Sequence, residues 1–203
     1  MKHAFPKGII ICIKIAVTLI ILAIIIYPIL LKTTNWMPRL NFTWEANYAR
    51  SHNQILYGEQ LNELNLNKLD MSQLKMPYAN LSWSSLRRAN LSGSDLSNAK
   101  LGGAVLIRAI CRGTNFNGAS LAKSNLTLAD LTSANLTHAD LHYANLLGAN
   151  LTGANLTGAN LQGAQYDQNT RWPEHFALQK TGAKYYFSDH LQEPLPDPNP
   201  IGR

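Results

Sequence analysis

The hydrophobic residues in the middle of the chain recur every five positions. From residue 79 to residue 168 the sequence divides without a gap into eighteen pentads, for example ANLSG and ANLTG. The first residue of each pentad is Ala, Ser or Thr, and the third is Leu in fifteen of the eighteen. This period matches neither an α-helix nor a β-strand, either of which would scatter the leucines over every face. The chain must therefore turn every five residues.

Such a pattern predicts an all-β solenoid in which the first and third residues of each pentad point inward. Gly occupies the fifth position of eight pentads, where it supplies the positive φ of a type II turn. Stacked coils would bury the leucines in one continuous core, and backbone groups would pair between coils. Three degenerate pentads over 64–78 keep the phase and extend the solenoid to 64–168. The period alone leaves three or four sides per coil open.

The tandem pattern A-[DN]-L-x-x resembles the pentapeptide-repeat family. This resemblance implies a right-handed four-sided β-helix with four pentads per coil, in which residues twenty apart stack at about 4.8 Å. The segment from Thr170 to Phe176, TRWPEHF, follows the last pentad and resembles an ending common in pentapeptide-repeat proteins of cyanobacteria. We therefore expect Trp172 and Phe176 to lie in a C-terminal cap.

A second hydrophobic pattern lies near the N-terminus. Residues 9–31 are predominantly apolar with Lys14 as the only charge, and the run is long enough to span a bilayer as one transmembrane α-helix. A cleaved signal peptide is the alternative, but no small-x-small cleavage motif follows the run. We therefore predict a retained single-pass membrane anchor. Basic residues flank it on both sides, so the positive-inside rule does not assign the side of the solenoid.

The remaining segments complete the predicted organisation. A basic flank, residues 1–8, precedes the anchor, and residues 32–63 form a linker and N-terminal cap with a helix-compatible stretch over 43–57. Residues 169–187 form the C-terminal cap. The proline-rich end, 188–203, predicts a disordered tail.

A spacing of twenty residues sorts the surface positions into columns. One column holds Lys68, Arg88, Arg108 and Leu128, and its neighbour holds Arg87, Ile107, Thr127 and Leu147. Outward-pointing aliphatic residues beside a basic rim predict a protein contact; a solvated face with scattered apolar residues is the alternative. The candidate partner surface consists of Lys68, Arg87, Arg88, Ile107, Arg108, Leu128 and Leu147.

Charge narrows the possible functions. The formal net charge is +6, from 18 Lys and Arg against 12 Asp and Glu. Family members that protect DNA gyrase imitate duplex DNA with a long acidic surface, and this basic chain departs from that pattern. The chain is also predicted to be tied to a bilayer, so we do not expect DNA mimicry. Binding of anionic lipid or nucleic acid through the basic column is an alternative, with nucleic acid the less favoured of the two.

The sequence contains no glycine-rich phosphate loop, metal-ligand spacing or nucleophile constellation. It therefore predicts no catalytic, cofactor-binding or metal-binding residues, and no enzyme activity. The favoured function is a membrane-anchored scaffold that presents a rigid rod to an unidentified protein partner. An accessory subunit of a membrane transport complex is a further alternative, for which Lys14 is the only hint. The sequence leaves the oligomeric state open.

Overall fold

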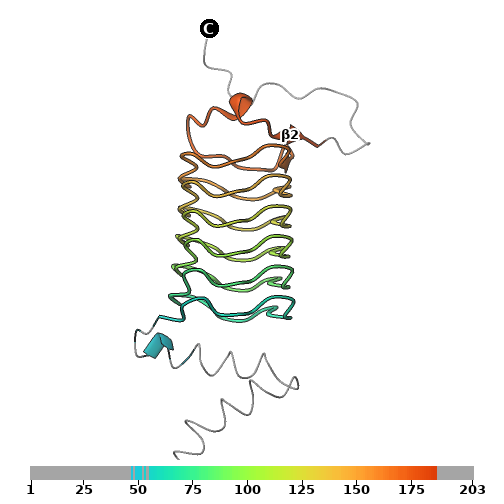
Figure 1. Ribbon diagram of the computed structural model, residues 1–203. Coiled ribbons are helices and arrows are strands. Elements are labelled where there is room, and N and C mark those ends of the chain that lie inside the picture. The colour runs from blue at the N-terminus through green and yellow to red at the C-terminus, as the bar shows by residue number, and fades with distance from the viewer. Residues whose placement is uncertain (1–46, 48, 52, 54, 187–203) are drawn as a thin grey trace, which may run out of the picture. The chain divides into compact units, whose positions relative to one another are not determined.

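Backbone pairing joins residues that lie twenty positions apart. In the computed structural model, which describes residues 47, 49–51, 53 and 55–186, parallel bridges run from Ile55↔Lys75 to Asn145↔Gln165. Each coil therefore holds four pentads, and the coils stack on one another along an axis (Figure 1). This confirms the predicted β-helical solenoid. Its right-handed sense remains a prediction from the family resemblance.

The first and third residues of the pentads fill the core, as the period predicted. Leu81, Leu91 and Ala89 are completely buried, as are most other third-position leucines and first-position alanines of the pentads. The hydroxyl of Ser84, a first-position residue, donates to the Leu81 carbonyl at 2.7 Å. The hydroxyls of Ser94 and Thr114, also at first positions, both donate to the Leu91 carbonyl at 2.7 Å. The buried hydroxyl of Ser124, in contrast, has no hydrogen-bond partner among the described residues, so the small size of the side chain matters more at this position than its hydrogen bond.

Cys111 takes the place of a leucine in this core. It is fully buried, and burial followed by the charge of Asp130 raises the pKa of its thiol. A thiol held in its neutral form makes a poor nucleophile. Cys111 therefore acts as a small hydrophobic core residue.

The turn after each leucine places the fifth residue in the left-handed region. Gly103 has φ +67, but Trp83 (φ 60) and Leu128 (φ 57) adopt the same conformation without being glycine. A backbone hydrogen bond closes the turn: for example, the N–H of Ser84 donates to the Leu81 carbonyl at 3.2 Å. Glycine is therefore the unstrained residue at this position, but pairing on both sides holds other residues there as well.

Asn and Asp at the second position support the turns from outside. The side chain of Asn135 accepts the backbone N–H of Thr137 at 3.1 Å and its hydroxyl at 2.6 Å. Its amide also donates to Asn115, one coil away, at 3.0 Å. The second position therefore serves both the local turn and the stacking of coils.

The regular coil starts earlier than the predicted boundary at residue 64. Ile55 already pairs with Lys75, and Leu61, the third residue of pentad 59–63, is 3% exposed. The sequence did not reveal pentad 59–63 because its first residue, Glu59, is charged, whereas the degenerate pentads over 64–78 all begin with Leu. Residues 47 and 49–51 are helical, so the helix-compatible stretch ends before Ile55.

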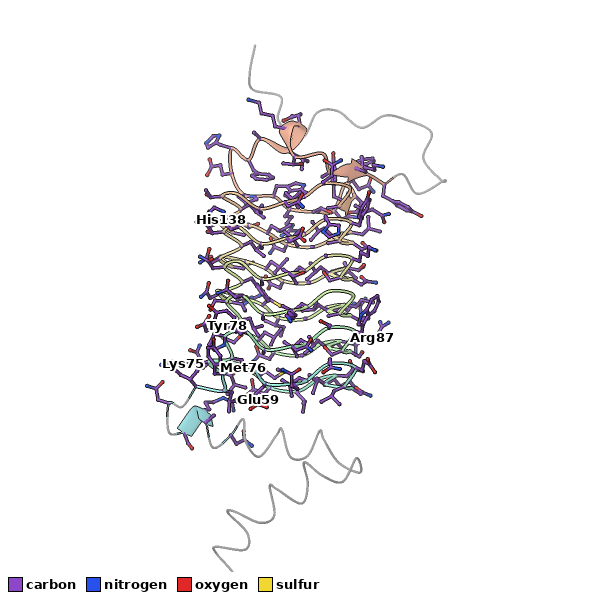
Figure 2. The ribbon with its side chains drawn as sticks, in the orientation of Figure 1. Glu59, Lys75, Met76, Tyr78, Arg87 and His138 are labelled. Carbon is purple, nitrogen blue, oxygen red and sulfur yellow. The ribbon has the colours of Figure 1, made fainter. Side chains whose placement is uncertain are left out.

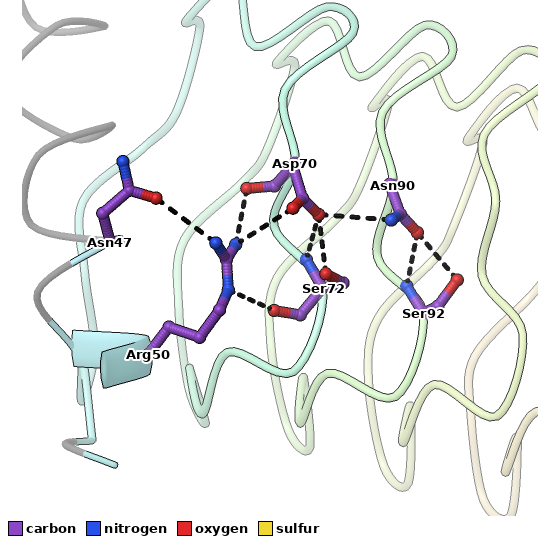
Figure 3. Close-up of polar contacts among 6 residues, drawn as sticks. All are labelled: Asn47, Arg50, Asp70, Ser72, Asn90 and Ser92. Atoms are coloured by element: carbon purple, nitrogen blue, oxygen red, sulfur yellow. Dashed lines mark hydrogen bonds and ion pairs between the residues drawn. The ribbon is translucent and has the colours of Figure 1, made fainter. Parts of the chain in front are cut away.

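Arg50 joins this helical segment to the first coil. Its guanidinium contacts the main chain of Asp70 and Ser72, and a hydrogen bond from its Nη1 to Asn47 Oδ1 measures 3.2 Å (Figure 3). The side chain of Asp70 in turn accepts the amide of Asn90 in the second coil at 3.2 Å. The N-terminal edge of the solenoid is thereby linked to two coils.

At the other end, the chain makes one irregular coil over the last regular one. Strand β1 (Gln165–Tyr166) pairs in parallel with β2 (Lys184–Tyr185), and the short 3-10 helix η2 (Leu178–Lys180) lies between them in sequence. The ring of Trp172 packs edge-on against Tyr166 and stacks on Phe176 with centroids 5.4 Å apart. Tyr166 is the third residue of the last pentad, where most pentads have a buried leucine, so these rings close the core.

The predicted membrane anchor lies outside the described residues, as do the basic flank and the proline-rich tail. Within residues 47, 49–51, 53 and 55–186, no helix is long and apolar enough to cross a membrane. The anchor over residues 9–31 therefore stays a prediction from the sequence.

Candidate interaction surface

Five stacked pentads form one side of the solenoid, which we call the basic face. They are 64–68, 84–88, 104–108, 124–128 and 144–148, and their second residues pair in one unbroken column of parallel bridges. Hydrogen bonds tie the outward residues of adjacent coils together: the backbone N–H of Arg88 donates to the Ile107 carbonyl at 3.0 Å. The backbone of the basic face is thus regular and fully paired from coil to coil.

The turn conformation sets which side chains the basic face presents. Lys68, Arg88 and Arg108 are fifth-position residues with φ between 56 and 60, and each is exposed. Arg87 at a fourth position is exposed as well, and it projects from the opposite edge of the stack to His138 in Figure 2. Four cationic side chains therefore emerge from three consecutive coils on the same side.

A hollow of about 400 Å³ lies among these side chains. Its lining residues are Asn67, Lys68, Arg87, Arg88, Ile107 and Arg108. The structure therefore brings together five of the seven residues predicted for the partner surface. Leu128, 47% exposed, and half-buried Leu147 lie in the next coils of the same columns rather than in the hollow.

Asn67 is a lining residue that the sequence reasoning missed. Its Oδ1 accepts the backbone N–H of Arg87 and the hydroxyl of Ser85, both at 2.8 Å, so it fixes the second coil of the basic face against the first. The signal was present in the sequence, because position 67 lies twenty residues before Arg87 in the same column.

The positive charge of the basic face is not neutralised. Its five pentads contain Lys68, Arg87, Arg88 and Arg108 but no Asp or Glu. Among the described residues, the Arg–carboxylate ion pairs are Arg50–Asp70 and Arg112–Asp130, and neither involves a side chain of the basic face. The two His–carboxylate contacts, His142–Asp140 and His175–Glu174, lie elsewhere as well. Four like charges without a carboxylate create a local positive potential that favours an anionic partner.

The other sides of the solenoid carry mixed charge. Asp130 illustrates this: burial opposes its ionisation, but hydrogen bonds from Thr132 and Arg112 outweigh burial and hold its pKa below the usual range. His142 lies 2.8 Å from Asp140, and the described part of the chain holds no group of three His, Cys, Asp or Glu side chains arranged to bind a metal ion. These sides therefore carry both positive and negative side chains, whereas the charge of the basic face is all positive.

Comparison with known proteins identifies the class. Residues 60–93, 94–132 and 134–165 match the family model of pentapeptide repeats in eight copies, and the chain belongs to this family. Proteins of this family are in general non-catalytic repeat proteins. No curated protein matches the sequence.

Solved pentapeptide-repeat structures resemble this chain. Rfr23 from the cyanobacterium Cyanothece 51142 is 32% identical, with 64% of this chain and 98% of that chain covered and a TM-score of 0.47. HetL from the cyanobacterium Nostoc sp. strain PCC 7120, a protein involved in heterocyst differentiation regulation, is 30% identical with a TM-score of 0.46; the match covers 63% of this chain and 55% of HetL.

Proposed function

We propose that this protein is a membrane-anchored, non-catalytic scaffold whose basic face binds a protein partner. The observation that carries the proposal is the hollow on that face, where four unneutralised cations surround Ile107. Protein interfaces combine an apolar centre with Arg-rich polar surroundings, which is the composition found here. The anchor over residues 9–31 would hold this surface at a membrane.

The solenoid supports such a role mechanically. Every coil of the basic face is hydrogen bonded to its neighbours through the backbone, so the backbone positions from which the outward side chains project are fixed relative to one another. A surface that is ordered before binding loses less conformational entropy when a partner docks. A rigid rod is therefore a suitable support for a binding surface.

Binding of anionic lipid headgroups is the second candidate. Lys68, Arg87, Arg88 and Arg108 all lie in the first three coils, the part of the solenoid that follows the predicted anchor in sequence. Clusters of Lys and Arg close to a membrane segment are attracted to anionic leaflets. Headgroup binding would not require the aliphatic residues of the later coils, which is why we favour a protein partner.

Co-purification with charge-reversal variants tests the proposal. The full-length chain would be isolated from cells of its source with a non-ionic detergent, either unchanged or carrying Arg88→Glu and Arg108→Glu. Glu63 already occupies a fifth position with φ 59, so glutamate is compatible with this backbone. We expect the partner to be lost from the double variant.

The matched control carries Lys100→Glu and Lys123→Glu, which change the net charge equally on a different side of the solenoid. We expect this variant to retain the partner. Equal recovery with both double variants, or equal loss, would show that the basic face is not the binding surface. Far-ultraviolet circular dichroism of each variant checks that the solenoid is intact.

A further inference from the structure

We infer that the basic face binds a short, extended polypeptide segment that carries acidic residues at one end and aliphatic residues at the other. This inference rests on the proposed function and specifies the chemistry of the partner. It is drawn from the order of charged and apolar side chains along the five stacked coils, from the hollow among them, and from the residue types that the face lacks.

The first three coils would bind the acidic end of the segment. Lys68, Arg87, Arg88 and Arg108 surround the hollow, and three of these four side chains are arginines. The planar guanidinium group forms paired hydrogen bonds with a carboxylate, a geometry that lysine cannot offer. Since none of the four has an ion pair within the described residues, the carboxylates of a ligand would not have to displace an internal partner.

The later coils supply the aliphatic end. Ile107 lines the hollow itself, Val105 stands at a second position where most pentads have Asn or Asp, and Leu128 and Leu147 continue the two columns. Leu128 is 47% exposed, and its positive φ is a costly conformation for a leucine. Covering these side chains would add a hydrophobic contribution to the electrostatic one.

The dimensions of the face set the length of the segment. Adjacent coils lie one strand spacing apart, so the distance from the first to the fifth pentad of the basic face is about 19 Å. An extended chain advances about 3.3 Å per residue, and about six residues would cover this distance. A ligand of that length could place carboxylates over the first coils and aliphatic side chains over the last.

The residue types that are absent from the basic face argue against single-stranded nucleic acid. Proteins that bind it stack bases on aromatic side chains, and the five pentads contain no Phe, Tyr or Trp. The exposed aromatic residues Trp83, Tyr143 and Tyr78 stand in pentads of other sides. A basic surface continued by aliphatic side chains fits a peptide better than a base.

Fluorescence anisotropy with defined probes tests the inference on the full-length chain in non-ionic detergent. The probes are a labelled glutamate-leucine peptide of four glutamates and two leucines, made in both N-to-C orders, the same peptides with serines for leucines, a six-residue thymidine oligonucleotide and a labelled inositol hexakisphosphate. We expect the glutamate-leucine peptide to bind most tightly. Arg88→Glu with Arg108→Glu should weaken it about tenfold or more, and Lys100→Glu with Lys123→Glu should leave it unchanged.

A second pair of variants tests the aliphatic end. Leu128→Ser with Leu147→Ser should reduce the affinity for the glutamate-leucine peptide to that for the glutamate-serine peptide, and leave the latter unchanged. The inference is overturned if no peptide binds, or if the oligonucleotide or inositol hexakisphosphate binds as tightly as the glutamate-leucine peptide. If no peptide binds but charge reversal still removes the cellular partner, only this inference fails and the proposed function stands.

Discussion

The guanidinium of Arg50 is bound to the main chain of Asp70, whose carbonyl accepts a hydrogen bond from Nη2 at 2.8 Å. Nε donates to the Ser72 carbonyl at 3.0 Å. One coil further on, the corresponding carbonyls of Asn90 and Ser92 accept backbone N–H groups from Met71 and Gln73. On this side of the first coil, one side chain therefore replaces the two backbone donors of an absent coil, and it covers an edge that could otherwise pair with another strand.

Arg50→Ala should destabilise the solenoid by about 1–2 kcal/mol, because two carbonyls lose their donors. Urea unfolding of the full-length chain in detergent, followed by circular dichroism, measures this. Arg112→Ala is the control: it removes an exposed ion pair with Asp130 and should cost less than about 1 kcal/mol. Equal losses for the two variants would contradict a capping role for Arg50.

Asp167, near the C-terminal end of the solenoid, should make the stability of the fold depend on pH. Burial opposes its ionisation, but hydrogen bonds from the backbone of Gly148, the hydroxyl of Thr170 and Asn169 together lower its pKa in the folded state. Its stabilising contribution is therefore present above the unfolded pKa and is lost as the pH falls through the lower folded value. Asp167→Asn should flatten the decline in melting temperature below about pH 4. An unchanged decline would contradict this assignment.

Two glycines with the same turn geometry should respond differently to alanine. Gly103 and Gly113 have φ +67 and +61, but a Cβ at Gly103 would lie 2.4 Å from the Trp83 ring, whereas one at Gly113 meets no atom within 4 Å. Gly113→Ala should cost about 1 kcal/mol from backbone strain alone. Gly103→Ala should cost more, and Trp83→Ala should remove the excess. A double-mutant cycle measured by urea unfolding checks this.

Cys111 should react with iodoacetamide only after the coil opens. It is fully buried and its thiol pKa is raised, so neither access nor thiolate is available in the folded state. In a Cys12→Ser background, mass spectrometry should show labelling that rises along the urea unfolding curve. Rapid labelling without denaturant would contradict the continuous core.

The sequence predicted the parts of the fold that depend on repetition. Leu81 and its equivalents could be assigned to the core because a five-residue period allows few alternatives, and the resemblance added the spacing of twenty. The spacing of twenty would have paired Arg50 with the Asp70 side chain, but its capping of the first coil could not be predicted, because that role depends on two main-chain carbonyls that leave no trace in the sequence. The early start of the coil at Ile55 was hidden because its next pentad begins with Glu59.

The candidate surface was predictable to the same extent. The spacing of twenty residues predicts that Arg88 and Arg108 lie next to each other, as they do in the structure. The hollow could not be predicted, since it depends on how the long side chains extend from left-handed turns and on Asn67 holding the backbone of Arg87. Pairing is encoded by the repeat, whereas the shape of the surface depends on individual departures from it.

Site-specific photo-crosslinking in cells tests the central claim most directly. A diazirine amino acid would replace Thr127 on the basic face, or Thr132 on the next side; both are half-buried fourth-position threonines whose hydroxyls bind the second residue of their own pentad. We predict a protein adduct of discrete mass from position 127 and none from position 132, with the adduct abolished by Arg88→Glu and Arg108→Glu. Adducts from both positions, or one that survives the charge reversal, would contradict the proposal that the basic face is the binding surface.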